Sequence, residues 1–152
     1  MKYIGMIVSF AFFAVTQANA QDSTKTVKSL LDNKQFTFQP TNMLPLRGTL
    51  KQLDPVYFLK LRGDSLISYL PYFGRAYSAP LNPEDAGYNF TSTKFSYAVK
   101  AGKKNSYEIT IATKDKTNNI NIILTAYDNG SADLRVNSTD KQPISYNGYI
   151  RK

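Results

Sequence analysis

The 152-residue sequence contains no histidine and no cysteine. Histidine is the commonest general base and transition-metal ligand in proteins, so its absence excludes Ser-His and Cys-His triads. The lack of cysteine excludes a thiol nucleophile, a disulfide framework and a thiolate metal site. Zinc sites of the usual Cys/His kinds are excluded by both absences together. We therefore predict no metal site, no cofactor and a fold that relies on its hydrophobic core.

The first 20 residues have the features of a secretory signal peptide. Lys2 supplies a short positive region, residues 4–15 are almost continuously apolar, and Ala18 to Ala20 has the small-x-small pattern that signal peptidase cleaves. The apolar run is shorter than the roughly 20 residues that span a membrane. We predict cleavage after Ala20 and a periplasmic or secreted protein that is not membrane-spanning once cleaved. Without a lipobox cysteine, the chain would not be acylated.

Residues 21–152 are predicted to form a single β-rich domain, because that length suits one hydrophobic core. Removing Lys2 reduces the 19 basic residues to 18 against 11 acidic residues, a net charge of +7. An exported chain does not meet nucleic acid, so the charge favours an anionic envelope glycan or lipid, or another envelope protein, as partner. A solvated surface is the favoured explanation of the charge, since several lysines cluster at predicted turns: Lys100, Lys103, Lys104, Lys114 and Lys116.

The sequence predicts one N-terminal helix followed almost entirely by strands. Apolar residues recur at helical spacing from Val27 to Leu31 within residues 22–33, with Ser23 or Thr24 as the N-cap. Beyond residue 35, apolar and polar residues alternate with a period of two, which indicates strands with one buried face. We predict a mainly β fold: an antiparallel meander of about eight or nine strands that forms a curled sheet, a sandwich or a partly open barrel.

Turn residues mark the ends of several predicted strands. The first strand contains Phe36 to Phe38 and is predicted to end at Pro40. Gly63-Asp64 and Asn129-Gly130 are typical of hairpin turns. The other predicted strands cover residues 56–62, 65–70, 88–93 (resuming over 95–99), 107–111, 120–126, 132–136 and 144–150.

The densest aromatic cluster lies in residues 70–77, Leu-Pro-Tyr-Phe-Gly-Arg-Ala-Tyr, between two predicted strands. As a binding site, its rings would form a platform for a sugar and Arg75 would hold a carboxylate or phosphate. As architecture, Pro71 would end a strand, Gly74 would allow a tight bend, and the rings would cover an open end of the sheet. The candidate ligand-binding residues are Tyr69, Tyr72, Phe73, Arg75 and Tyr77.

The same segment carries a resemblance to a known family. Together with Phe36-Thr37-Phe38, Ser78-Ala79-Pro80, Gly87-Tyr88-Asn89-Phe90, Asn129-Gly130 and residues 142–148 (Gln-Pro-Ile-Ser-Tyr-Asn-Gly), it resembles the bacterial "domain of unknown function 4251" family of small exported proteins. The resemblance covers about residues 30–150. It implies a single domain in the cell envelope, and it brings no activity and no catalytic residues.

Acidic side chains are the only acid–base candidates that remain. Most of them sit at predicted turns, where aspartate is favoured for backbone reasons, and no pair is singled out as the two facing carboxylates of a glycosidase. We therefore predict a non-catalytic envelope protein that binds a ligand, a glycan or a partner protein. The alternatives are a carrier of a small apolar ligand in a lipocalin-like cavity and, ranked below it, a hydrolase that uses carboxylates alone.

Overall fold

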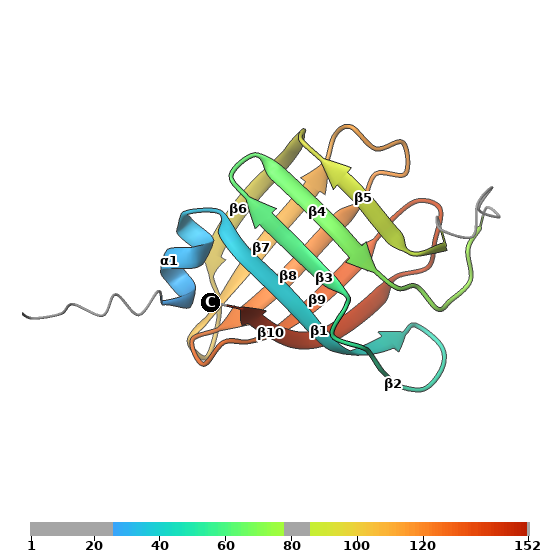
Figure 1. Ribbon diagram of the computed structural model, residues 1–152, viewed down its shortest axis with the longest axis horizontal. Coiled ribbons are helices and arrows are strands. Elements are labelled where there is room, and N and C mark those ends of the chain that lie inside the picture. The colour runs from blue at the N-terminus through green and yellow to red at the C-terminus, as the bar shows by residue number, and fades with distance from the viewer. Residues whose placement is uncertain (1–25, 78–85, 152) are drawn as a thin grey trace, which may run out of the picture.

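The computed structural model of the protein describes residues 26–77 and 86–151 and shows a curled antiparallel sheet with one short helix (Figure 1). The predicted signal peptide, its cleavage site after Ala20 and the segment Ser78-Ala79-Pro80 lie outside the described residues. The elements are α1 (Val27–Asp32), β1 (Gln35–Pro45), β2 (Lys51–Gln52), β3 (Phe58–Arg62), β4 (Ser65–Leu70), β5 (Tyr88–Ser92), β6 (Phe95–Ala101), β7 (Ser106–Thr113), β8 (Asn121–Tyr127), β9 (Ser131–Asn137) and β10 (Ile144–Arg151).

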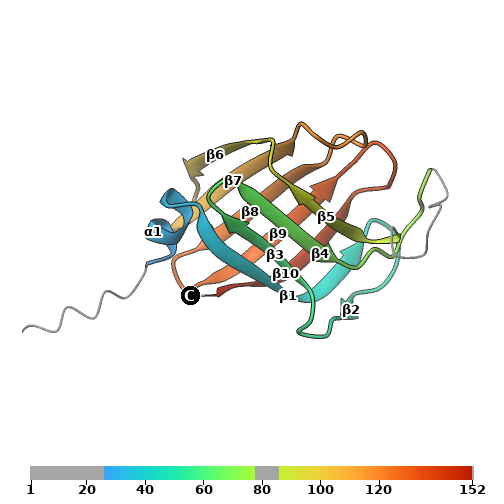
Figure 2. The same ribbon diagram turned by 45° about the horizontal axis from the view of Figure 1, so that its top comes forward.

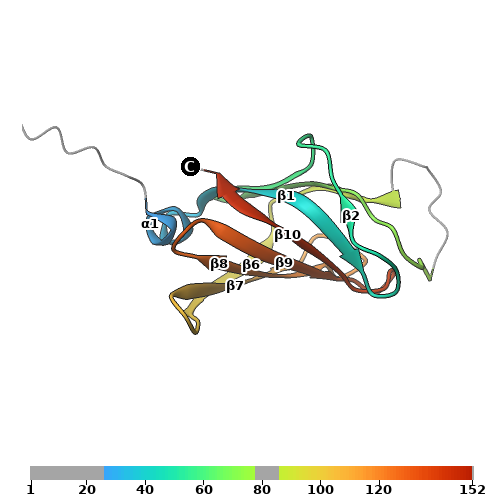
Figure 3. The same cartoon turned by 90° about the horizontal axis from the view of Figure 1, so that it is seen from below.

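The sheet curls almost completely into a barrel, and the pairing of β1 with β10 joins the strands of the two halves of the chain into this one sheet. Nine antiparallel strands follow the order β5-β4-β3-β1-β10-β9-β8-β7-β6, and β2 is added to β1. Among the described strands, β5 and β6 are the two edges of this order. Figures 2 and 3 show a flattened shape in which β1, β3, β4 and β5 lie across β7, β8 and β9. The predicted mainly β fold with one N-terminal helix is confirmed, as a partly open barrel.

A short turn joins the two edge strands at one corner of the barrel. The sequence predicted one strand that resumes at Phe95, but Thr93 and Lys94 instead connect separate strands at opposite edges of the sheet. Asp115, between β7 and β8, accepts hydrogen bonds from the Ser92 hydroxyl at 2.5 Å and the Thr93 amide at 3.2 Å. The corner is therefore held by a side chain from the neighbouring hairpin, which local alternation does not reveal.

Strand β1 is longer than predicted. The sequence predicted its end at Pro40, which lacks an amide hydrogen, but the strand continues through a register shift between Pro40 and Asn42. Such an irregularity is where a strand tolerates proline. Opposite Pro40 lies Gly148, where a Cβ atom would stand 2.8 Å from the Pro40 Cα and overlap the Gln39 carbonyl oxygen. Close approach of the two backbones therefore requires glycine at position 148.

Helix α1 begins one residue after Thr26, whose hydroxyl accepts a hydrogen bond from the Ser29 amide at 3.3 Å. The N-cap is thus Thr26, and the predicted caps Ser23 and Thr24 lie outside the described residues. Its predicted apolar face is confirmed, since Val27, Leu30 and Leu31 are buried. A six-residue helix has little stability alone, so this burial is what holds it.

The helix is also tied to an edge of the sheet. The hydroxyl of Tyr97 on β6 donates a hydrogen bond to the carbonyl oxygen of Leu31 at 2.8 Å, and the Lys34 ammonium lies 5.4 Å from the Tyr97 ring centroid. Burial raises the pKa of the Tyr97 hydroxyl well above its ordinary value. The edge strand β6 is therefore covered by α1 at this end of the barrel (Figure 1).

The inward faces of both layers fill the barrel interior with side chains. Alternation places residues i and i+2 of each strand inside, and the resulting positions are almost all apolar. The largest fully buried side chains are those of Tyr88, Tyr146, Phe38, Leu31, Met43, Leu59, Leu61, Leu66, Leu70, Ile109, Ile111 and Ile122.

Candidate functional site

The aromatic segment follows β4 and crosses one end of the barrel. Strand β4 ends at Leu70, as Pro71 predicted. The Tyr72 hydroxyl donates a hydrogen bond to the Arg75 carbonyl oxygen at 2.7 Å, and a Cβ atom at Gly74 would lie 2.6 Å from that hydroxyl oxygen. The bend predicted at Gly74 is therefore closed by Tyr72 itself.

The segment is fastened to the β9–β10 connection through its backbone. The Gln142 amide donates to the Arg75 carbonyl oxygen at 3.0 Å, and the Tyr77 amide donates to the Asp140 carbonyl oxygen at 2.7 Å. Between them, Ala76 forms an isolated antiparallel bridge with Lys141. Residues 75–77 thus behave as a short extra strand on residues 140–142.

A buried lysine lies beneath this connection. The Lys141 ammonium is 5.0 Å from the Tyr88 ring centroid and 5.8 Å from that of Tyr72, and the two rings meet edge to face at 5.8 Å. It donates a hydrogen bond to the Gly87 carbonyl oxygen at 3.1 Å and lies 3.5 Å from the Asp140 carboxylate. Aromatic faces, a carbonyl and a carboxylate together stabilise this buried charge.

Two pKa shifts follow from this packing. Burial raises the pKa of the Tyr88 hydroxyl to about 12, although its hydrogen bond with Ser138 at 3.0 Å opposes the shift. Burial also opposes ionisation of Asp140, but the Ser138 hydroxyl, the Lys141 ammonium and the Asn118 amide outweigh it and lower the pKa of that carboxyl. Asp140 is therefore an anion and Tyr88 a neutral hydrogen-bonding group at neutral pH.

The structure does not gather the five predicted site residues around one point. Tyr72 belongs to the lysine cluster, whereas Phe73 is 52% exposed and lies under the Lys51 ammonium, 4.8 Å from its ring centroid. Arg75 and Tyr77 are exposed, and both are fixed by their backbones. Tyr69 lies on the outer face of β4. Ligand binding by these residues remains a prediction, and the contacts of Tyr72 support the architectural interpretation.

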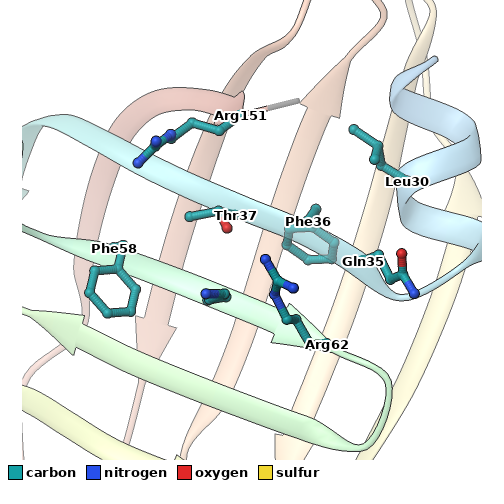
Figure 4. A pocket seen from close by; sticks show the side chains of 8 residues that line it. Leu30, Gln35, Phe36, Thr37, Phe58, Arg62 and Arg151 are labelled. Carbon is teal, nitrogen blue, oxygen red and sulfur yellow. The ribbon is translucent and has the colours of Figure 1, made fainter. Parts of the chain in front are cut away.

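A second candidate site lies on the outer face of the barrel. A groove of about 540 Å³ crosses β1, β3 and β10 next to α1 (Figure 4). Thr37 of β1 is the register partner of both Lys60 on β3 and Arg151 on β10. Two strand spacings, about 10 Å, separate those two cations, and Arg62 follows Lys60 on the same face. The groove is lined by Leu30, Gln35, Phe36, Thr37, Phe58, Lys60, Arg62 and Arg151.

The charge of this groove is of one sign. None of its lining residues is acidic, and within residues 26–77 and 86–151 neither Lys60 nor Arg62 forms an ion pair. On the opposite layer, in contrast, Lys100 of β6 faces Glu108 of β7 in the register. The groove therefore presents three cations toward solvent with no anion of the described chain beside them.

One of the three cations is oriented by a buried amide. Gln39 is buried because residues 55–57 cover it, and its Nε2 donates to the carbonyl oxygens of Tyr57 at 2.6 Å and Pro55 at 3.1 Å. This leaves Gln39 Oε1 facing Arg151, whose Nη1 lies 3.5 Å away. The guanidinium is thereby held over the groove (Figure 4).

Sequence reasoning missed this groove. Alternation within β3 was sufficient to place Lys60 and Arg62 on one face, but Arg151 comes from the last strand, more than 100 residues after Thr37. Only the pairing of β1 with β10 brings them together. Among the described residues, no group of three or more Asp and Glu side chains is arranged to hold a metal ion, and no helix is long and apolar enough to cross a membrane.

Comparisons with known proteins agree with this fold. No curated protein matches the sequence. The structure is similar to the crystal structure of a DUF4251 family protein from Bacteroides eggerthii, with a TM-score of 0.58 and 12% identity over 81% of this chain and 83% of that chain. The sequence model of the family described as "Domain of unknown function (DUF4251)" matches residues 18–150. The chain therefore belongs to the DUF4251 family, as the motifs of its sequence predicted.

Proposed function

We propose that this protein is a non-catalytic protein of the bacterial cell envelope that binds an anionic ligand in the groove between β3, β1 and β10. The observation that carries the proposal is the placement of three cations in one groove without an acidic neighbour: Lys60 and Arg151 flank Thr37, and Arg62 lies opposite Gln35. Unpaired cations on one face repel one another, and a bound anion relieves that repulsion. Arginine adds bidentate geometry that suits carboxylate, sulfate and phosphate groups.

The packing of the barrel favours binding on the outside over carriage inside. A lipocalin-like carrier needs an internal cavity, whereas the inward positions of the described strands hold large, fully buried side chains such as Phe38, Leu66 and Tyr146. The groove is formed mostly by outward-facing residues of β1, β3 and β10. A ligand there would reach its site without opening the sheet.

The contacts of the acidic residues support a non-catalytic role. A carboxyl that acts as a general acid is left available to substrate and has a pKa raised toward neutrality. The shifted carboxyls here, Asp115 and Asp140, both have lowered pKa values and are hydrogen-bonded within the chain. Several others have structural partners: Asp32 pairs with Lys28, and Asp133 accepts a hydrogen bond from Asn147.

The binding experiment is an NMR titration of the purified protein with inorganic pyrophosphate at low ionic strength. We expect chemical-shift changes concentrated on β1, β3 and β10, and an affinity that falls as salt is added. Combining Lys60→Gln with Arg151→Gln should weaken binding by about tenfold. The matched control, Lys103→Gln with Lys114→Gln, removes the same charge from exposed turn positions and should leave the affinity unchanged. Equal losses of affinity in both double variants would show that binding depends only on net charge, and would refute a binding site in the groove.

The envelope location has its own test. The complete sequence is expressed in a bacterial host, and the product is recovered from the periplasmic fraction or the medium. We expect an N-terminus at Gln21, measured by mass spectrometry of the intact protein. A product that keeps residues 1–20 in the cytoplasm would overturn this part of the proposal and leave the anion site standing.

A further inference from the structure

A patch of three aromatic rings continues the basic groove along β3 and β4. Phe58 lines the groove and is the register partner of Tyr69, with ring centroids 6.2 Å apart. Tyr57 stacks on Tyr69 at 5.4 Å with an interplanar angle of 30°. Tyr69 is nevertheless 43% exposed. The cations of the groove therefore adjoin a cluster of aromatic rings in which Tyr69 is open to solvent.

The aromatic patch indicates which class of anionic ligand would bind in the groove. A simple anion gains nothing from exposed rings, because the interaction of a negative charge with a ring face is unfavourable. A sugar ring, in contrast, has apolar C–H faces that pack against an aromatic ring and hydroxyl groups that need hydrogen-bond partners. A ligand that contacts both the aromatic patch and the cations of the groove therefore combines a partly apolar ring with a negative charge.

The spacing of β3 supports such a ligand. Phe58, Lys60 and Arg62 point to the same face, and successive members are about 7 Å apart along the strand. A ring over Phe58 would therefore place its acidic substituent beside Lys60, and the next charge along the ligand beside Arg62. Thr37 and Gln35 line the same groove and supply a hydroxyl and an amide for the sugar hydroxyls.

From this juxtaposition we propose that the groove binds an acidic saccharide, whose ring packs on Phe58 and Tyr69 and whose carboxylate, sulfate or phosphate group pairs with Lys60, Arg62 and Arg151. The inference rests on the proposed anion-binding function and names its ligand class. The three acidic groups share one chemistry, a negative charge on a sugar ring, and differ only in the atoms that carry it.

The test compares ligands by isothermal titration calorimetry: trigalacturonate, its neutral methyl ester, glucose 6-phosphate and inorganic pyrophosphate. We expect trigalacturonate or glucose 6-phosphate to bind about tenfold more tightly than pyrophosphate, and the ester to bind at least tenfold more weakly than the acid. Which of the two acidic sugars binds better identifies the anionic group. Binding of phosphatidylglycerol vesicles without binding of either sugar would overturn the proposal in favour of a lipid surface.

Variants separate the ring from the charge. Tyr69→Ala should lower the affinity for the acidic sugar by about fivefold, because the sugar packs on this ring. The affinity for pyrophosphate, which does not contact the ring, should not change. Tyr69→Thr, which keeps a strand-forming side chain, should behave alike and guards against a folding defect. Tyr77→Ala is the matched control, since Tyr77 is 67% exposed on the aromatic segment. If only Tyr77→Ala lowered the affinity for the acidic sugar, the sugar site would lie on the aromatic segment and this inference would be overturned.

The failure of this inference is distinguishable from that of the proposed function. Suppose that pyrophosphate binding requires Lys60 and Arg151, but the Tyr69 variants bind acidic sugar with the same affinity as the wild type. The saccharide inference is then wrong, and the proposed anion site is retained. If no anion shifts the resonances of β1, β3 and β10, both fall together.

Discussion

The Tyr146 hydroxyl on β10 donates a hydrogen bond to the Pro71 carbonyl oxygen at 2.6 Å, between residues 75 positions apart in the chain. Tyr146 is fully buried, and burial raises the pKa of its hydroxyl well above the ordinary value. The carbonyl it satisfies belongs to Pro71, the first residue after β4. The last strand of the barrel therefore fixes the point at which the aromatic segment leaves the sheet.

Tyr146→Phe is expected to destabilise the fold by about 1–3 kcal/mol, because it removes the donor and leaves the Pro71 carbonyl without this partner in a partly buried position. The measurement is the free energy of unfolding from urea denaturation. Tyr149→Phe is the control, since Tyr149 lies three residues away on the same strand and is 44% exposed. Equal small losses in the two variants would show that the Tyr146–Pro71 bond contributes no net stability.

Tyrosines with raised pKa values should ionise only at strongly alkaline pH. Burial raises the pKa of Tyr88 to about 12, against about 10 in the unfolded chain. A folded-state pKa above the unfolded value favours the protonated folded form, so this stability is complete below about pH 10 and is lost as the pH rises through 12. We expect ultraviolet titration to show Tyr72, Tyr88, Tyr97, Tyr107 and Tyr146, whose pKa values are raised, ionising late, and the buried Tyr88 and Tyr146 ionising only with unfolding.

Tyr88→Phe checks the assignment. It should remove one late-titrating tyrosine and reduce the alkaline loss of stability, because its phenol no longer ionises on unfolding. A titration in which Tyr88→Phe leaves the number of late-ionising tyrosines unchanged would contradict the buried position of this side chain.

The sequence was sufficient to predict the class of fold because most of the evidence for it is local. Alternation in β7, β8 and β9 placed Ile109, Ile122 and Leu134 inside, and all three are buried. Gly63 and Asn129-Gly130 marked real turns, and Gly63 and Gly130 have positive φ values. What could not be predicted was which strands meet. The pairing of β1 with β10, and the register shift that admits Pro40, depend on contacts across the whole chain.

The corner between β5 and β6 yields a pH-dependent prediction. The Ser92 hydroxyl lowers the pKa of Asp115; burial opposes this, and the Thr93 amide adds to it. A lowered folded-state pKa gives stability that is present above the unfolded value of about 3.9 and is lost as the pH falls through the folded value. Asp115→Asn should therefore flatten the fall in unfolding free energy below about pH 4, measured by urea denaturation at several pH values.

Ser92→Ala provides the matching half of a double-mutant cycle. Because the two side chains share one hydrogen bond, the double variant should lose less stability than the two single variants added together. Additive losses, or an unchanged acid dependence in Asp115→Asn, would show that the Ser92–Asp115 contact does not hold the corner.

The candidate sites illustrate the same limit of local sequence reasoning. Residues 70–77 stand out because they are adjacent in sequence, yet the contacts of Tyr72 and the backbone bonds of residues 75–77 are those of a structural closure. The basic groove leaves no such local signal, because its cations come from two strands that flank β1. Tyr69 is the one predicted residue that adjoins the groove, through Phe58.

Gly148→Ala should be the most damaging of the small substitutions in the barrel. A Cβ atom there would stand 2.8 Å from the Pro40 Cα and overlap the Gln39 carbonyl oxygen, so β1 and β10 would have to separate. We expect a loss of about 3 kcal/mol in unfolding free energy, and weaker pyrophosphate binding, because Gln39 faces Arg151. Gly63→Ala is the control: its φ of 57° makes alanine strained by about 1 kcal/mol, but no atom lies within 4 Å of the added carbon. If Gly63→Ala proved the costlier change, the close approach of β1 and β10 at Gly148 would not be a constraint on this fold.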